Sequence, residues 1–75
     1  MDRYFFDVVG HGRSEFDYAG CVLPTPEGAY DAAESIAYDL AVGGEDTIGW
    51  VVNVCSIEGR KLFSIPVLAS YLAAI

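Results

Sequence analysis

The sequence predicts an α+β domain in which one helix covers one face of a four-stranded antiparallel sheet. An amphipathic helix pattern occupies residues 25–40, and stretches of alternating apolar residues flank it, two before and two after. The order is therefore strand, strand, helix, strand, strand (β-β-α-β-β). A right-handed crossover of the helix over the sheet gives the strand order 2-1-3-4. We expect a single domain at residues 1–67 and a short, apolar C-terminal tail at residues 68–75.

Four segments have the alternation that is typical of β-strands. The first two are residues 3–9 and 15–18, joined by a five-residue loop that contains two glycines. The last two are residues 48–55 and 61–67. Pro66 has no backbone donor, so the fourth strand is expected at a sheet edge. The face toward the helix is expected to carry large side chains: Tyr4, Phe6, Phe16, Trp50 and Phe63.

The helix pattern has signals at both ends. Thr25 is an N-cap candidate, Pro26 stands at the first helical position, and two glycines follow at 43 and 44. One side carries small and aliphatic residues: Ala29, Ala32, Ala33, Ile36, Ala37 and Leu40. The other side carries polar residues and a tyrosine: Glu27, Asp31, Glu34, Ser35 and Tyr38. We expect the alanine side to pack on the large side chains of the sheet.

The chain contains more apolar residues than the core of one small domain can bury. The chain has 75 residues, of which 53% are hydrophobic, and part of this surplus falls on the second sheet face. The tail repeats apolar residues at the spacing of a short helix. Either the tail or a second copy of the chain is expected to cover that face, with a frayed tail as a third possibility. The self-association candidates are Phe5, Val51, Leu68, Tyr71 and Leu72.

Composition limits the classes of function. Eleven acidic residues against four basic ones give a net charge of -7, which repels a nucleic-acid backbone. Cys21 and Cys55 form neither a disulfide framework nor a zinc-binding pattern. No signal peptide and no membrane-spanning stretch of about 20 apolar residues is seen. We expect a cytoplasmic protein with no cofactor and no metal that binds neither nucleic acid nor a membrane.

No set of residues supports a catalytic assignment. His11 stands between glycines in a turn, whereas proton transfer needs a firmly held imidazole. Residues 12–16 begin like a nucleophile elbow but lack its closing glycine, and the glycines at 10 and 12 lack the third glycine of a dinucleotide fingerprint. An enzyme working around His11 is the least favoured hypothesis, and we expect no catalytic residues.

The polar side of the helix is a candidate partner surface, because residues 25–40 contain no Lys or Arg. Like charges three or four residues apart oppose a helix by a few tenths of a kcal/mol per pair, so a purely structural helix would normally intersperse lysines. The alternative is an ordinary solvated face in an acidic protein. The partner-binding candidates are Glu27, Tyr30, Asp31, Glu34 and Tyr38.

Four short motifs suggest a family. They are Arg-Tyr-Phe-Phe-Asp at residues 3–7, Asp17-x-x-Gly20-x-x-Leu23-Pro24, the alanines at 29, 32 and 33, and Val-Asn-Val at 52–54 with Glu58-Gly59. With these the chain resembles a family of short uncharacterised proteins abundant in alphaproteobacteria, a domain of unknown function. The resemblance implies an intracellular bacterial domain of the same strand and helix order, with no established activity and no functional residues to carry over. Asp2, where proline is common, and the apolar tail depart from it.

The sequence thus favours a small non-catalytic protein-interaction or assembly module that forms a homodimer. The alternative is an acidic regulatory module that binds a basic protein partner, or mimics nucleic acid, through the helix face.

Overall fold

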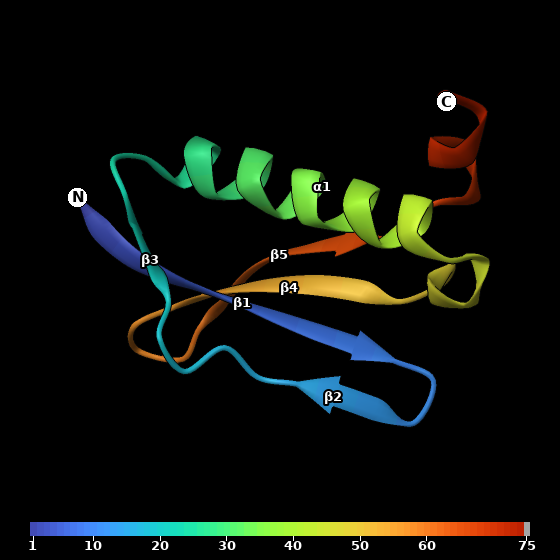
Figure 1. The fold of residues 1–75 in the computed structure, drawn as a ribbon. Helices are drawn as coiled ribbons and strands as arrows, with labels where there is room; N and C mark the ends of the chain where they lie inside the picture. Colours follow the sequence, from blue (N-terminus) through green and yellow to red (C-terminus); the bar gives the residue numbers. More distant parts are fainter. Residues whose placement is uncertain (75) are drawn as a thin grey trace.

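The computed structural model describes residues 1–74 (Figure 1), so Ile75 of the expected tail lies outside the described residues. It has one antiparallel sheet with a single long helix above it. The elements in chain order are β1 (Asp2–Gly10), β2 (Arg13–Glu15), β3 (Cys21–Leu23), α1 (Pro26–Gly43), the 3-10 helix η1 (Glu45–Thr47), β4 (Val51–Ser56), β5 (Lys61–Pro66) and the 3-10 helix η2 (Ala69–Ala74).

The strand order β2-β1-β4-β5 is the predicted one, in an α+β domain whose helix lies between two strand pairs. The long central pair, β1 and β4, runs from Tyr4 opposite Ser56 to Val9 opposite Val51. β5 lies at the sheet edge, as Pro66 predicts, because an edge position does not require its missing donor.

The strands that pair with the edge of β1 facing away from β4 differ from the prediction. Residues 15–18 were expected to form the second strand, but β2 ends at Glu15 and a further strand, β3, pairs with the start of β1. The expected five-residue loop is also wrong, because only His11 and Gly12 separate β1 from β2. Gly12 has φ +75°, which favours glycine and permits so short a reversal.

Asp17 explains the interruption between β2 and β3. Its carboxylate accepts hydrogen bonds from the backbone N–H of Phe6 (3.2 Å), Ala19 (3.1 Å) and Gly20 (3.0 Å). The β1 amide at Phe6 is thereby paired by a side chain instead of a neighbouring strand. Gly20 closes this bend at φ +72°, where an added Cβ would lie 2.9 Å from the Tyr4 carbonyl oxygen. The Asp17-x-x-Gly20 motif is therefore a structural bend.

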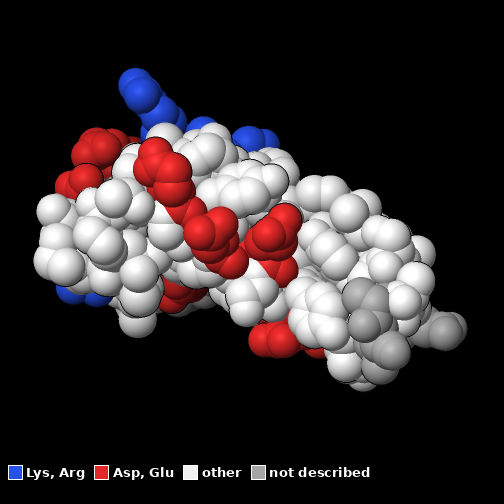
Figure 2. Space-filling model, turned by 90° about the horizontal axis from the view of Figure 1, so that it is seen from above, with Lys and Arg blue, Asp and Glu red and all other residues white. Residues whose placement is uncertain are grey.

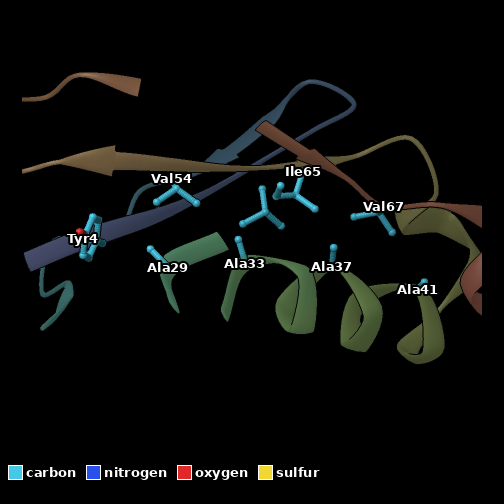
Figure 3. Packing of buried hydrophobic residues seen from close by; sticks show 9 residues of the cluster. Tyr4, Ala29, Ala33, Ala37, Ala41, Val54, Ile65 and Val67 are labelled. Carbon is cyan, nitrogen blue, oxygen red and sulfur yellow. The ribbon is translucent and has the colours of Figure 1, made fainter. Parts of the chain in front are cut away.

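α1 begins and packs as predicted. The Thr25 Oγ1 accepts a hydrogen bond from the Gly28 amide at 3.0 Å, and Pro26 occupies the first turn. Four alanines one turn apart are fully buried against the sheet (Figure 3), and they are Ala29, Ala33, Ala37 and Ala41. Small side chains on the helix allow close approach to the larger core residues, which are Tyr4, Val52, Val54 and Ile65 of the strands and Val67 directly after β5.

Of the expected core aromatics, one lies outside the core and another packs against it from a position before β4. Phe16 is wrong as a core residue, because it follows the end of β2 and is 57% exposed. Trp50 precedes β4, which begins at Val51 and not at residue 48, and its half-buried ring packs against the core from the end of the sheet. A Cβ on Gly10 would lie 2.3 Å from that ring, so the indole covers a bare stretch of β1.

The described part of the tail lies beside the helix. η2 packs against α1 on the helix side of the sheet (Figure 1), and Tyr71 joins the core there. It therefore does not cover the opposite sheet face. No helix among residues 1–74 is long and apolar enough to cross a membrane.

Candidate interaction surfaces

The outer sheet face, meaning the side turned away from α1, consists of half-buried residues from the two central strands. Strand register places Phe5 opposite Cys55, Asp7 opposite Asn53 and Val9 opposite Val51, so their side chains share one face. Within residues 1–74, α1 and η2 lie on the other side of the sheet, and η1 lies beyond the end of β4 (Figure 1). The structure thus brings Phe5 and Val51 onto one open surface.

A groove of about 300 Å³ lies at one end of the outer sheet face. Its lining includes Phe5, Asp7 and Cys55 of the strands and three strongly exposed residues of the neighbouring loops, namely Phe16, Tyr18 and Ile57. Their exposed fractions are 57%, 87% and 68%. These residues are not among the predicted surface candidates, and Phe16 and Tyr18 were assigned to a strand because they alternate with acidic residues. Gly20, which follows them, is unfavourable inside a strand and was the signal that regular strand structure is interrupted here.

The Cys55 thiol lies in the groove beside the Asp7 carboxylate. Its Sγ is 3.9 Å from Asp7 Oδ2, and burial, followed by the Asp7 charge, raises the pKa of the thiol above its usual 9.0, against a smaller opposing effect of Lys61. A raised pKa reduces the fraction of nucleophilic thiolate. The thiol therefore has the properties of a small, apolar side chain. Cys21 is a free, exposed cysteine in β3, which pairs with the edge of β1 that faces away from β4.

The polar side of α1 forms the second surface, called the helix face. Its acidic residues Glu27, Asp31 and Glu34 are exposed, as are Ser35 and Tyr38. Figure 2 looks down on this side and shows acidic side chains along its middle, with Lys and Arg at its margins. The helix face thus presents negative charge with no basic residue of α1 to neutralise it.

The two tyrosines of the helix face also pack against other elements. Tyr30 contacts Phe63 of β5 edge-to-face, with ring centroids 5.4 Å apart, and Tyr38 contacts Tyr71 of η2 at 5.9 Å. They keep exposed fractions of 40% and 37%. Both tyrosines therefore stabilise the fold and present an edge to solvent.

The other self-association candidates are separated from Phe5 and Val51. Tyr71 and Leu72 belong to η2, beside α1, and both are half-buried. Leu68 precedes η2 and is 41% exposed. η2 lies on the same side of the sheet as α1, away from the outer sheet face (Figure 1).

His11 occupies the β1–β2 turn and is exposed. Its Nε2 lies 3.4 Å from the Ile48 carbonyl oxygen. Among the described residues, no three His, Cys, Asp or Glu side chains gather where they would hold a metal ion.

These features define a small α+β domain with one covered and one open sheet face. A family model matches residues 3–69, and the chain belongs to that family, a domain of unknown function (DUF6894). The resemblance to a domain of unknown function is confirmed to that extent. Comparison with curated proteins gives no significant match, and comparison with solved structures gives none either.

Proposed function

We propose that this chain is a non-catalytic protein-interaction module that forms a homodimer through its outer sheet face. The observation that carries the proposal is the open apolar surface around Phe5, Val9 and Val51, with exposed Phe16 and Ile57 beside it. Phe5 lies on one side of Asp7 and Asn53, and the Val9–Val51 pair lies on the other. These apolar side chains are left partly in water and favour association, because joining two such faces removes apolar area from solvent. The two free cysteines support a reducing bacterial cytoplasm as its location.

The size of the surface indicates which residues take part. A stable dimer buries about 800 Å² on each partner, which is about a sixth of the accessible surface of 4697 Å². The sheet is four strands wide, because β2 and β3 share one edge of β1, and with a spacing of about 4.8 Å and an average length of about six residues it presents roughly 400 Å² on one face. The strands alone supply about half of the required area. We therefore include the exposed groove residues Phe16, Tyr18 and Ile57 in the proposed interface.

Sedimentation velocity over a range of protein concentrations tests this proposal. We expect a dimer for the unchanged chain, a monomer for Val51→Lys, and a dimer for the control Ser35→Lys, which adds the same charge on the helix face. Phe16→Ser provides a second variant, which is expected to weaken the dimer and to keep the fold, because Phe16 lies outside the core. A chain that stays monomeric up to several hundred micromolar, or a Val51→Lys variant that dimerises like the unchanged chain, would contradict the proposal.

A second candidate function is supported by the helix face. Its exposed carboxylates and its lack of basic residues favour a basic protein partner, since complementary charge speeds and orients association. A Glu27→Lys, Asp31→Lys, Glu34→Lys triple variant is expected to keep its circular dichroism spectrum and to lose a partner captured by the unchanged chain. Identical captured proteins for the two chains would count against it.

A further inference from the structure

Two hollows lie along the line where α1 meets β5 and η2. The first hollow, of about 350 Å³, is lined by Glu27, Tyr30, Asp31 and Phe63. The second hollow, of about 440 Å³, is lined by Asp31, Glu34, Ser35, Tyr38 and Tyr71. Asp31 belongs to both, so the hollows are neighbours.

The two hollows have the same construction. Each contains an edge-to-face aromatic pair with one ring from α1 and one from another element, at interplanar angles of 89° for Tyr30 with Phe63 and 64° for Tyr38 with Tyr71. Each also has two carboxylates from α1, three or four residues apart, which places them on one side of the helix. Neither lining contains a Lys or Arg.

This combination of groups selects a planar cation. An aromatic ring attracts a cation to its face, and a guanidinium can stack on the ring while it donates two parallel hydrogen bonds to a carboxylate. A lysine ammonium is a compact and strongly hydrated charge that cannot do both. The carboxylates oppose an anionic or purely apolar occupant, because the former is repelled and the latter would desolvate them.

The charge around the second hollow is consistent with this choice. Burial raises the pKa of the Tyr71 hydroxyl, and the negative charge of Glu34 raises it further. The nearby Glu34 carboxylate thus contributes a negative electrostatic field at the hydroxyl of this neutral tyrosine. A cation that enters the hollow meets that field without competition from a basic side chain in the lining.

We propose that the two hollows bind two arginine side chains of one extended segment of a basic protein partner. The spacing follows from the helix: Tyr30 and Tyr38 are eight residues apart, which is a rise of about 12 Å along the axis and a rotation of about 80° around it, so the two positions lie somewhat more than 12 Å apart. In an extended strand, residues i and i+4 lie on the same side about 13 Å apart, whereas i and i+2 span only about 7 Å. The matching segment is Arg-x-x-x-Arg. This inference rests on the second function above and is independent of self-association.

The test is fluorescence anisotropy with labelled nine-residue peptides at low salt. The peptides have equal charge and carry Arg-x-x-x-Arg, Arg-x-Arg or Lys-x-x-x-Lys in a Gly/Ser background. We expect Arg-x-x-x-Arg to bind the unchanged chain about tenfold more tightly than either other peptide, since each charge-assisted hydrogen bond to a carboxylate contributes a factor of this order.

Variants of the chain locate the binding. Asp31→Asn, which alters both hollows, is expected to weaken Arg-x-x-x-Arg at least tenfold, while Asp39→Asn removes the same charge from an α1 residue that lines neither hollow and leaves binding within about twofold. Tyr38→Leu preserves apolar contact with Tyr71 but removes the ring, and it should reduce Arg-x-x-x-Arg to the affinity of Arg-x-Arg.

The outcomes separate this inference from the second function. If the two arginine peptides bind equally, or if Asp39→Asn weakens binding as much as Asp31→Asn, the paired hollows are overturned while a generally basic partner survives. If none of the peptides binds at millimolar concentration, both proposals fail. Sedimentation of the same samples reports self-association separately.

Discussion

The backbone amide of Asp17 donates a hydrogen bond to Asp7 Oδ1 at 2.9 Å, and the Asp17 Oδ2 accepts one from the Phe6 amide at 3.2 Å. This reciprocal contact joins a loop to β1 through two carboxylates. It lies between β2 and β3, where regular strand pairing of the β1 edge is interrupted. The loop that carries Phe16 and Tyr18 beside the outer sheet face is thus held in place by Asp7 and Asp17.

Removing the Asp17 carboxylate should destabilise the whole domain. Asp17→Ala leaves the Phe6, Ala19 and Gly20 amides without their acceptor, and we expect a loss of about 1–3 kcal/mol in the free energy of unfolding. Urea denaturation measures this loss. The matched control is Asp39→Ala, on the exposed side of α1, which should change stability by less than about 0.5 kcal/mol. Equal effects of the two substitutions would contradict the role given to Asp17.

The Asp17 carboxylate also makes the free energy of unfolding depend on pH in the acidic range. The hydrogen bond from the Gly20 amide, with further ones from Phe6 and Ala19, lowers the pKa of Asp17 below its usual 3.8, although burial opposes this. Because the folded pKa is the lower one, the carboxylate contributes stability above the unfolded pKa and loses it as pH falls through the folded pKa. We expect Asp17→Asn to be less stable at pH 7 and to lose less stability below about pH 4. Urea midpoints measured at several pH values check this, and parallel pH profiles would contradict it.

Gly10 should tolerate no side chain. Its added Cβ would lie 2.3 Å from Trp50 Cε2, so Gly10→Ala displaces the indole and should cost about 1–3 kcal/mol. A control is Gly43→Ala at the end of α1, where the added Cβ meets nothing within 4 Å and a gain of up to about 1 kcal/mol is expected. Thermal unfolding monitored by Trp50 fluorescence and circular dichroism measures both. A Gly10→Ala variant as stable as the unchanged chain would exclude the contact.

The alanine side of α1 should reject larger residues. Ala33 is 0% exposed, and Ala33→Leu is expected to push the helix from the sheet at a cost of about 1–3 kcal/mol. Ser35→Leu places the same side chain on the exposed side of the helix and should change stability by less than about 0.5 kcal/mol. Chemical denaturation of both variants compares the two sides. A greater loss for Ser35→Leu would mean that the helix is turned the other way.

The sequence predicts the features that local patterns determine. Thr25, Pro26 and the alanine spacing define the start and the buried side of α1, because capping and the 3.6-residue period depend on neighbouring residues. Pro66 likewise predicts an edge strand, since its missing donor excludes a central position. These local rules, together with a right-handed crossover of the helix over the sheet, were sufficient to predict the strand order.

The features that failed depend on contacts between distant residues. Residues 15–18 alternate like a strand, but Asp17 bonds to the Phe6 amide eleven positions away, and no periodicity reveals such a bond. For the same reason the helix period places Tyr30 and Tyr38 at the surface without showing that Phe63 and Tyr71 pack against them. Both hollows therefore emerge only from the tertiary structure.

The open outer sheet face is tested most directly by labelling the Cys55 thiol in a Cys21→Ser variant while protein concentration is raised at fixed alkaline pH. Cys55 lies opposite Phe5 on that face. Burial together with Asp7 raises the pKa of the thiol, so labelling needs an alkaline pH, and that pH is the same at every protein concentration. If two copies join through this face, the labelling rate constant falls as concentration rises, and Val51→Lys abolishes the fall. A rate constant that is the same at every concentration would contradict the proposal that this face joins two copies.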